Sequence, residues 1–275
     1  MAGLTIESFA LTELTPYKGN PVLEAFQANK SAQVQNYDQP LVQQVQTAEQ
    51  NIKEQSSNIE DQLFKNFSAE ERAIFEKEVV DQVNIYQKSG SLRAERVLDW
   101  EETTTRIILE RDVPTKDYQF WKEFTSAVVY VESEGKHSAQ SEAGALGLTQ
   151  LTPSTAEMAA KRHGIYNFDL KNGWTALRLG RFYLGDLMER FGADISVLAY
   201  YAGENFAKQK VVSCLKNKGV DTNNRSDEQI KAYIDQYQVN IANLGSLDGK
   251  EYLIKVVTAL RILEQAREAI PQTRG

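Results

Sequence analysis

Cysteine and histidine are scarce in this sequence. Its 275 residues include one cysteine, Cys214, and two histidines, His137 and His163. A single thiol excludes an internal disulfide and a thiolate metal cluster, so we interpret Cys214 as an apolar filler. Two histidines are too few for a histidine-based metal site, and we interpret them as surface or helix-cap residues. We therefore expect no metal site built from thiols or histidines.

Long runs of one residue type are also missing. No extended basic run occurs and the formal net charge is −7, so the electrostatic footprint of nucleic-acid binding is absent. No apolar run approaches the ~20 residues that a membrane-spanning helix requires. Residues 1–10 lack the basic start and the apolar centre of a secretory signal. We therefore expect neither a nucleic-acid partner nor a transmembrane segment.

The remaining composition is that of an ordinary globular protein, 41% hydrophobic and 25% charged. The composition changes near Pro114. Residues before it are rich in Gln, Glu and Asn, whereas those after it contain most of the Gly, Trp and Tyr. We expect a helical, Gln-rich N-terminal region at 1–113 and a second region at 114–275.

Apolar residues recur at helical spacing on both sides of this boundary. Such patterns occupy residues 41–52, 59–67, 75–86, 121–131, 174–191 and 252–263. Ser68 with Glu71 predicts a capping box, and Thr152 with Pro153 predicts another helix start. No convincing alternating strand pattern occurs, so the expected fold class is all-α.

The Gln-rich run at 27–62 has helical apolar spacing, which argues against disorder. We interpret it as the solvated face of a long helix. A helix that binds a protein partner is the alternative, and the role of residues 1–113 stays open between a scaffold and a docking arm.

The most informative segment runs from Glu132 to Ala156. Glu132 directly follows an apolar helix face, one position beyond Val131. This position predicts a partly desolvated carboxyl with a raised pKa, able to act as an acid near neutrality. Glu134 and Glu142 lie in the polar stretch that follows, where solvation should keep them ionised. Glycines and a glutamine come next. Glycines allow the backbone to approach a ligand closely, and a glutamine side chain can both donate and accept hydrogen bonds.

The spacing of this segment resembles the catalytic signature of goose-lysozyme-like lytic transglycosylases of the soluble type. The matching positions are Glu132-Ser133, Ser141, Gly144-Ala145, Gly147-Leu148, Gln150, Pro153 and Thr155-Ala156. The family's Ala-Tyr-Asn-Ala-Gly element is matched by residues 199–203, and its Glu-Thr-Arg-x-Tyr-Val element is faintly matched by residues 248–253. The resemblance covers roughly residues 115–268.

The resemblance implies a lysozyme-like helical catalytic domain at 114–275 that cuts the glycan strand of peptidoglycan. Glu132 would protonate the oxygen between N-acetylmuramic acid and N-acetylglucosamine, then act as a base and yield a 1,6-anhydro end. The implied reaction uses no water, no metal and no organic cofactor. Tyr200 would lie near the acid and hydrogen-bond it, and Ser141 would bond the acid or the substrate acetamide. The implied substrate-binding residues are Ser141, Gly144, Gln150, Thr152, Ala199, Tyr200 and Ala202.

Several positions depart from the family pattern. Thr149 and Thr152 replace Met, Tyr201 replaces Asn, and Lys250 replaces Arg. We expect the threonines to make the floor of the cleft smaller and more polar, which affects sugar preference more than catalysis. The stretch at 204–247 is longer than usual and is expected to form a lobe over one end of the cleft.

Two other functions remain open. A hydrolytic muramidase would use a second carboxylate, Glu142 or Glu204, to activate water. A non-catalytic wall-binding or assembly protein would only hold the glycan. Because the implied substrate lies outside the cell membrane, we expect a periplasmic or cell-envelope protein whose signal has been removed, or alternatively a component of a phage particle.

Overall fold

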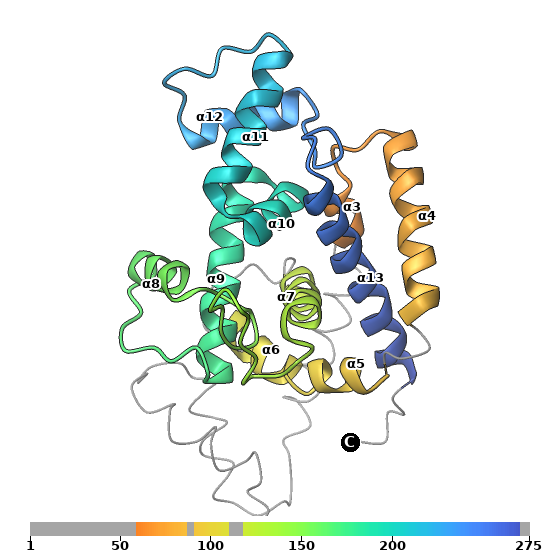
Figure 1. Ribbon diagram of the computed structural model, residues 1–275, viewed down its shortest axis with the longest axis vertical. Helices are drawn as coiled ribbons and strands as arrows, with labels where there is room; N and C mark the ends of the chain where they lie inside the picture. Colours follow the sequence, from red (N-terminus) through yellow and green to blue (C-terminus); the bar gives the residue numbers. More distant parts are fainter. Residues whose placement is uncertain (1–58, 87–90, 110–117, 270–275) are drawn as a thin grey trace, which may run out of the picture. The chain divides into compact units, whose positions relative to one another are not determined.

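The computed structural model describes residues 59–86, 91–109 and 118–269 (Figure 1). All of them fall in one compact unit, Ile52–Gly275. The helical pattern expected at 41–52 and most of the Gln-rich run lie outside the described residues.

Helices make up nearly all of the regular structure in these ranges. They are α3 (Ile59–Leu63), α4 (Ala69–Tyr86), α5 (Ser91–Leu98), α6 (Glu101–Leu109), α7 (Tyr118–Ser133), α8 (Pro153–Arg162), α9 (Gly173–Phe191), α10 (Ala193–Ala202), α11 (Glu204–Asn217), α12 (Asp227–Gln236) and α13 (Leu247–Ala269). Within the described part of the chain, β pairing is limited to isolated bridges in the loop between α7 and α8. The all-α prediction is confirmed.

Local sequence signals set several helix ends, including the two starts that were expected. The Ser68 amide donates to Glu71 and the Glu71 amide donates to the Ser68 hydroxyl, at 2.9 and 3.1 Å, so the capping box is present. Thr152 caps α8 by accepting the Thr155 amide at 3.3 Å. Gly192 ends α9 with φ +85°, a value that a residue without a Cβ adopts readily.

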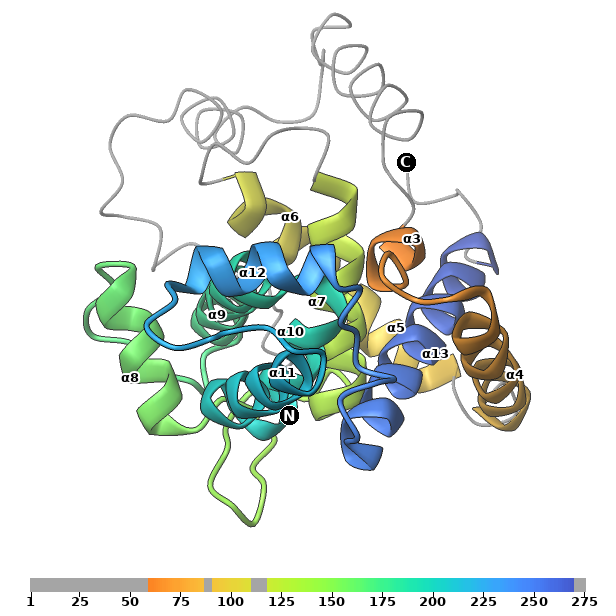
Figure 2. The same ribbon diagram turned by 90° about the horizontal axis from the view of Figure 1, so that it is seen from above.

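Helix α13 packs against several other helices. It contacts α7, α4, α10 and α5, and Figures 1 and 2 both show it beside α4. Its buried side chains include Val256, Val257 and Leu260. Arg261 on this helix donates to Glu60 of α3 and Glu76 of α4 at 2.7 and 2.8 Å, which joins the early and late helices by charge as well as by apolar contact.

The helices before residue 113 are therefore part of the same compact unit as those after it. Besides the α4–α13 contact, α6 packs against α7 and α9, and α5 packs against α7. The proposed division at 113/114 stays a prediction about domain organisation. The described early helices support α7, the helix that ends at the candidate acid.

The stretch at 204–247 forms helices α11 and α12 together with the segment that leads into α13. Helix α11 packs on α10, and α12 packs on α9. Figure 1 shows α11 and α12 next to each other beyond α10. This placement puts the start of α11 immediately after the Ala199–Gly203 element.

Candidate functional site

Glu132 lies in the last turn of α7 and is half-buried. Burial is the main influence on its carboxyl and raises the pKa to about 7. A hydrogen bond from Tyr252 and the positive charge of Lys255 act in the opposite direction but are smaller. Near neutral pH this carboxyl is therefore present both as a proton donor and as a base, as expected from its position beyond an apolar face.

Tyr252 of α13 donates its hydroxyl hydrogen bond to Oε1 of Glu132. Its side chain is buried, and burial raises the pKa of the phenol well above its usual range, so it stays a neutral donor. The ring of Tyr201 stacks on the Tyr252 ring with centroids 4.9 Å apart and an interplanar angle of 27°. The partner of the acid is thus fixed by packing from α10.

Tyr200 does not have the role expected of it. Its hydroxyl donates to the carbonyl oxygen of Thr149 at 2.5 Å instead of to the acid. Tyr200 is still close to Glu132, because the carboxylate charge contributes to the raised pKa of its phenol, after burial. The phenol that bonds the acid is Tyr252, and Tyr200 anchors the loop that follows the acid.

Two glycines shape this loop for different reasons. Gly147 has φ +75°, and an added Cβ would lie 2.0 Å from the Leu170 carbonyl oxygen. Gly144 has φ +81°, but a Cβ there would meet no atom within 4 Å. Gly147 is required by close packing and by its backbone angle, whereas Gly144 is required by the angle alone and leaves open space at the surface.

Ser141 and Gln150 use most of their polar groups inside the loop. The Ser141 hydroxyl accepts the Ala145 amide at 3.0 Å, and no bond from it to Glu132 is present among the described residues. The Gln150 side-chain amide donates to the carbonyls of Ala139 and Gly147 at 3.1 and 2.8 Å. Both of its N–H groups are therefore used, and its Oε1 is the group available to a ligand, as an acceptor only.

The two threonines do not form a polar floor. Thr149 is fully buried, and its hydroxyl donates to the Ala176 carbonyl at 2.9 Å on α9. Its side chain packs where a Cβ on Gly180 would otherwise fit. Thr152 uses its hydroxyl to cap α8 and to bond Ser154 at 3.1 Å. The structure corrects the expectation for Thr149, which supports the loop from behind.

The other carboxylates near this region differ in environment from Glu132. Glu134 pairs with Arg93 at 2.5 Å and Lys136 at 2.9 Å, and the Lys136 bond lowers its pKa most. It stays ionised, as expected, but because of neighbouring cations more than solvation. Glu204 pairs with Arg190 and, at 3.4 Å, with Arg162.

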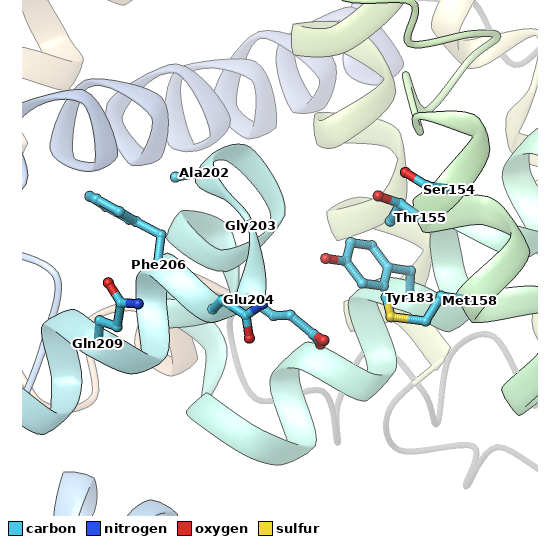
Figure 3. Close-up of a pocket in the computed structure, with 10 residues that line it drawn as sticks. Ser154, Thr155, Met158, Tyr183, Ala202, Gly203, Glu204, Phe206 and Gln209 are labelled. Atoms are coloured by element: carbon cyan, nitrogen blue, oxygen red, sulfur yellow. The ribbon is translucent and has the colours of Figure 1, made fainter.

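A pocket of about 560 Å³ lies where α10 meets α11, facing α8 and α9 (Figure 3). Ala202 lines it, whereas Ala199 is fully buried, so the Ala199 side chain packs in the core and not on a substrate surface. In Figure 3 the Tyr183 hydroxyl and the Glu204 side chain point into the space between these helices. The full lining is Ser154, Thr155, Met158, Tyr183, Ala202, Gly203, Glu204, Asn205, Phe206 and Gln209.

Sequence reasoning did not select Tyr252 or, apart from Glu204, the residues of α11. Tyr252 could have been found, because it is the tyrosine of the Asp248–Leu253 element. The pocket residues on α11 follow the matched element and carry no motif of their own. In the described ranges, no group of three or more His, Cys, Asp or Glu is placed to hold a metal ion. No helix there is both long and apolar enough to cross a bilayer.

Comparison with known families gives one match, between residues 112–220 and the model described as "Transglycosylase SLT domain". The matched segment is less than half of the chain, and it contains Glu132 and the Ala199–Gly203 element. Residues 112–220 therefore match a transglycosylase SLT domain, which confirms the expected family for this segment. No curated protein matches the chain significantly.

Two solved structures are similar over part of the chain. The 70 kDa soluble lytic transglycosylase SLT70 of Escherichia coli is 17% identical, with a TM-score of 0.43 over 60% of this chain and 24% of that protein. An inactive mutant of the lytic transglycosylase Slt of Pseudomonas aeruginosa is 17% identical, with a TM-score of 0.38 over 70% of this chain and 30% of that protein. This chain therefore spans less than a third of either protein.

Proposed function

We propose that this chain, with its transglycosylase SLT domain, is a peptidoglycan lytic transglycosylase in which Glu132 is the general acid and then the general base. The observation that carries the proposal is the half-buried carboxyl with a pKa raised to about 7, held by a neutral phenol. One residue can serve both steps only if neither of its protonation states is strongly disfavoured.

The reaction can be written with every proton placed. Protonated Glu132 gives its proton to the oxygen between N-acetylmuramic acid and N-acetylglucosamine, and the bond from the anomeric carbon to that oxygen breaks. The substrate's acetamido oxygen stabilises the anomeric carbon. Glu132 then takes the proton of the C6 hydroxyl while O6 bonds to the anomeric carbon. The products are a free 4-hydroxyl and a 1,6-anhydro end.

Tyr252 and the loop support different parts of this reaction. The Tyr252 hydrogen bond favours the ionised carboxylate, so it stabilises the state reached after the first proton transfer. The Gln150 Oε1 can accept an N–H or O–H from a sugar, and Gly144 leaves open space beside the loop. Ser141, Thr152, Tyr200 and Ala202 would act as loop anchors, cap or pocket wall around the bound glycan.

The environment of Glu204 favours this reaction over hydrolysis. A hydrolase of the inverting type needs a second carboxylate free to activate water. Glu204 is held by two arginines, Arg162 and Arg190, and Glu142 is exposed to solvent. We propose the cell envelope as the place of action.

The test is the chemistry of the products from purified, metal-free sacculi. Mass spectrometry should find muropeptides with 1,6-anhydro ends, one water lighter than reducing ends. Glu142→Gln is the matched control, because this carboxylate is exposed, and it should give the same products at the same rate. Reducing ends would identify a hydrolase, and the absence of any product would identify a glycan-binding protein.

A further inference from the structure

Three aromatic side chains stand out among the exposed large apolar residues of the described ranges. They are Tyr166, Tyr201 and Phe206, with 81%, 51% and 39% of their surface exposed. Two of them, Tyr201 and Phe206, lie on either side of Gly203, where α10 ends and α11 begins. Exposed aromatic area is unfavourable in water, so the rings on either side of this helix junction indicate a binding surface.

Tyr201 connects this surface to the acid. One face of its ring stacks on Tyr252, whose hydroxyl bonds Glu132. Half of the Tyr201 side chain remains exposed, so the ring presents apolar area to solvent one side chain away from the partner of the acid. The position departs from the Asn of the family element, so this ring is a property of the present chain.

The pocket begins at the residue after Tyr201. Phe206 of α11 lines it beside Ala202, and Figure 3 shows the Tyr183 ring on the other side. Between them lie hydroxyl and amide side chains, including Asn205 and Gln209. The pocket therefore combines apolar ring surface with neutral donors and acceptors.

The charge of the lining is neutralised. Glu204 is its charged member and pairs with Arg190 and Arg162. The Tyr183 phenol has a pKa raised to about 12 by burial, so it is an uncharged donor. Lys210 approaches the Phe206 ring with Nζ 5.4 Å from its centroid, and this contact engages its charge at the edge of the pocket. A strongly charged ligand would find no unpaired opposite charge among the lining residues.

We propose that this pocket, with Tyr201, is a subsite for neutral sugar rings of the glycan strand, and that Tyr201 and Phe206 are its specificity-determining side chains. A pyranose has an apolar face that fits an aromatic ring, and its hydroxyl and acetamido groups fit the surrounding amides and hydroxyls. The proposal rests on the proposed function for its choice of ligand. It also gives the glycan strand a path over the protein, from Glu132 across Tyr201 to the pocket beside α11.

Binding can be measured without turnover in the Glu132→Gln protein. The probe is the neutral β-1,4-linked hexamer of N-acetylglucosamine, titrated by calorimetry. Tyr201→Ala and Phe206→Ala, each added to Glu132→Gln, should weaken binding about tenfold, whereas Tyr201→Phe should bind like the parent. Tyr166→Ala is the matched control, an exposed tyrosine outside the pocket, and should bind like the parent.

Two results would overturn the subsite. One is unchanged hexamer affinity in both alanine variants. The other is binding of a peptide-bearing muropeptide, weakened by Phe206→Ala, together with no binding of the neutral hexamer, which would assign the pocket to the peptide. Circular dichroism melts of each variant exclude loss of fold as the cause of weaker binding.

The subsite and the proposed function can fail separately. If the parent binds the hexamer through Tyr201 and Phe206 but the wild-type chain releases no anhydro ends, the subsite stands and the reaction is wrong. If anhydro ends are released and both alanine variants bind and turn over normally, the reaction stands and the subsite is wrong. In active protein Phe206→Ala should raise KM while the loss of activity at high pH keeps its midpoint.

Discussion

The Tyr252 hydroxyl donates a hydrogen bond to the Glu132 carboxylate across 120 positions of sequence. The contact exists because α13 packs along α7, which brings a buried phenol to the end of the helix that carries the acid. Burial favours the protonated carboxyl, and the hydrogen bond favours the ionised one. The balance of these two effects sets the pKa of Glu132 at about 7.

The pH dependence of turnover should report the Glu132 carboxyl. The acid must be protonated in the free enzyme, so kcat/KM should fall about tenfold per pH unit above a midpoint near 7. An unperturbed carboxyl would lose activity from about pH 4.5. Initial rates of release of soluble muropeptides between pH 5 and 9 provide the measurement. A profile that already falls below pH 5.5 would mean that burial does not control this acid.

Tyr252→Phe should change both the alkaline limb of the pH profile, which is the fall of kcat/KM at high pH, and the rate itself. Loss of the phenol removes a bond that favours the carboxylate, so the pKa of Glu132 should rise and the alkaline limb should move to higher pH. Because the carboxylate formed after the first transfer is less stabilised, kcat should fall by roughly tenfold, the scale of one lost charge-assisted hydrogen bond.

Tyr200→Phe is the matched control for Tyr252→Phe. It removes a phenol that bonds the Thr149 carbonyl, so the loop is less well anchored while the acid keeps its partner. We expect a higher KM and an alkaline limb that stays in place. If the two phenylalanine variants have the same pH profile, Tyr252 does not act through Glu132.

Local signals in the sequence were sufficient for much of the fold. The capping residues Ser68 and Thr152, the terminating Gly192 and the apolar spacing of α7 act within a few positions of themselves, so they can be recognised without the fold. Glu132 was recognisable for the same reason, since its burial follows from the helix face that precedes it.

Contacts between distant helices were not recognisable in this way. The choice of Tyr252 over Tyr200 as partner of the acid depends on how α13 and α10 pack, and both tyrosines sit in matched elements. Asp194 precedes an apolar run, as a residue at the N-cap position of α10 would. Gly192 is at that position instead, and the Asp194 carboxylate accepts the Ile241 amide at 2.8 Å from a distant loop.

The two loop glycines should respond differently to alanine. Gly147→Ala places a Cβ against the Leu170 carbonyl in addition to an unfavourable φ, so it should destabilise the protein by more than about 3 kcal/mol. Gly144→Ala meets open space and should cost only about 1–2 kcal/mol for its φ. Chemical denaturation of both variants measures the difference. Equal losses would show that close packing at Gly147 does not matter.

Asp194 should make stability depend on pH. Burial raises its pKa from 3.8 to about 7, so the folded state binds this proton more tightly than the unfolded state. The resulting stabilisation is complete below about pH 3.8 and is lost as the pH rises to about 7. Asp194→Asn removes the titration, so it should reduce this loss of stability by on the order of 4 kcal/mol.

Asp194→Ala is the comparison for the hydrogen bond itself. It also removes the titration, but it leaves the Ile241 amide without its acceptor, which should cost about 1–3 kcal/mol at every pH. Thermal melts of both variants at pH 4.5 and 8 separate the two effects. A wild-type protein that is no less stable at pH 8 than at pH 4.5, with melts of Asp194→Asn parallel to it, would contradict the assigned pKa.

The most direct test of the proposed function is the digestion of purified sacculi by the wild-type chain and by Glu132→Gln, with the released muropeptides identified by mass spectrometry. Glutamine keeps the shape of the side chain but has no proton to donate as an acid. We predict 1,6-anhydro muropeptides from the wild type and none from a Glu132→Gln protein with a native circular dichroism spectrum. Anhydro products from folded Glu132→Gln at the wild-type rate would contradict the assignment of Glu132.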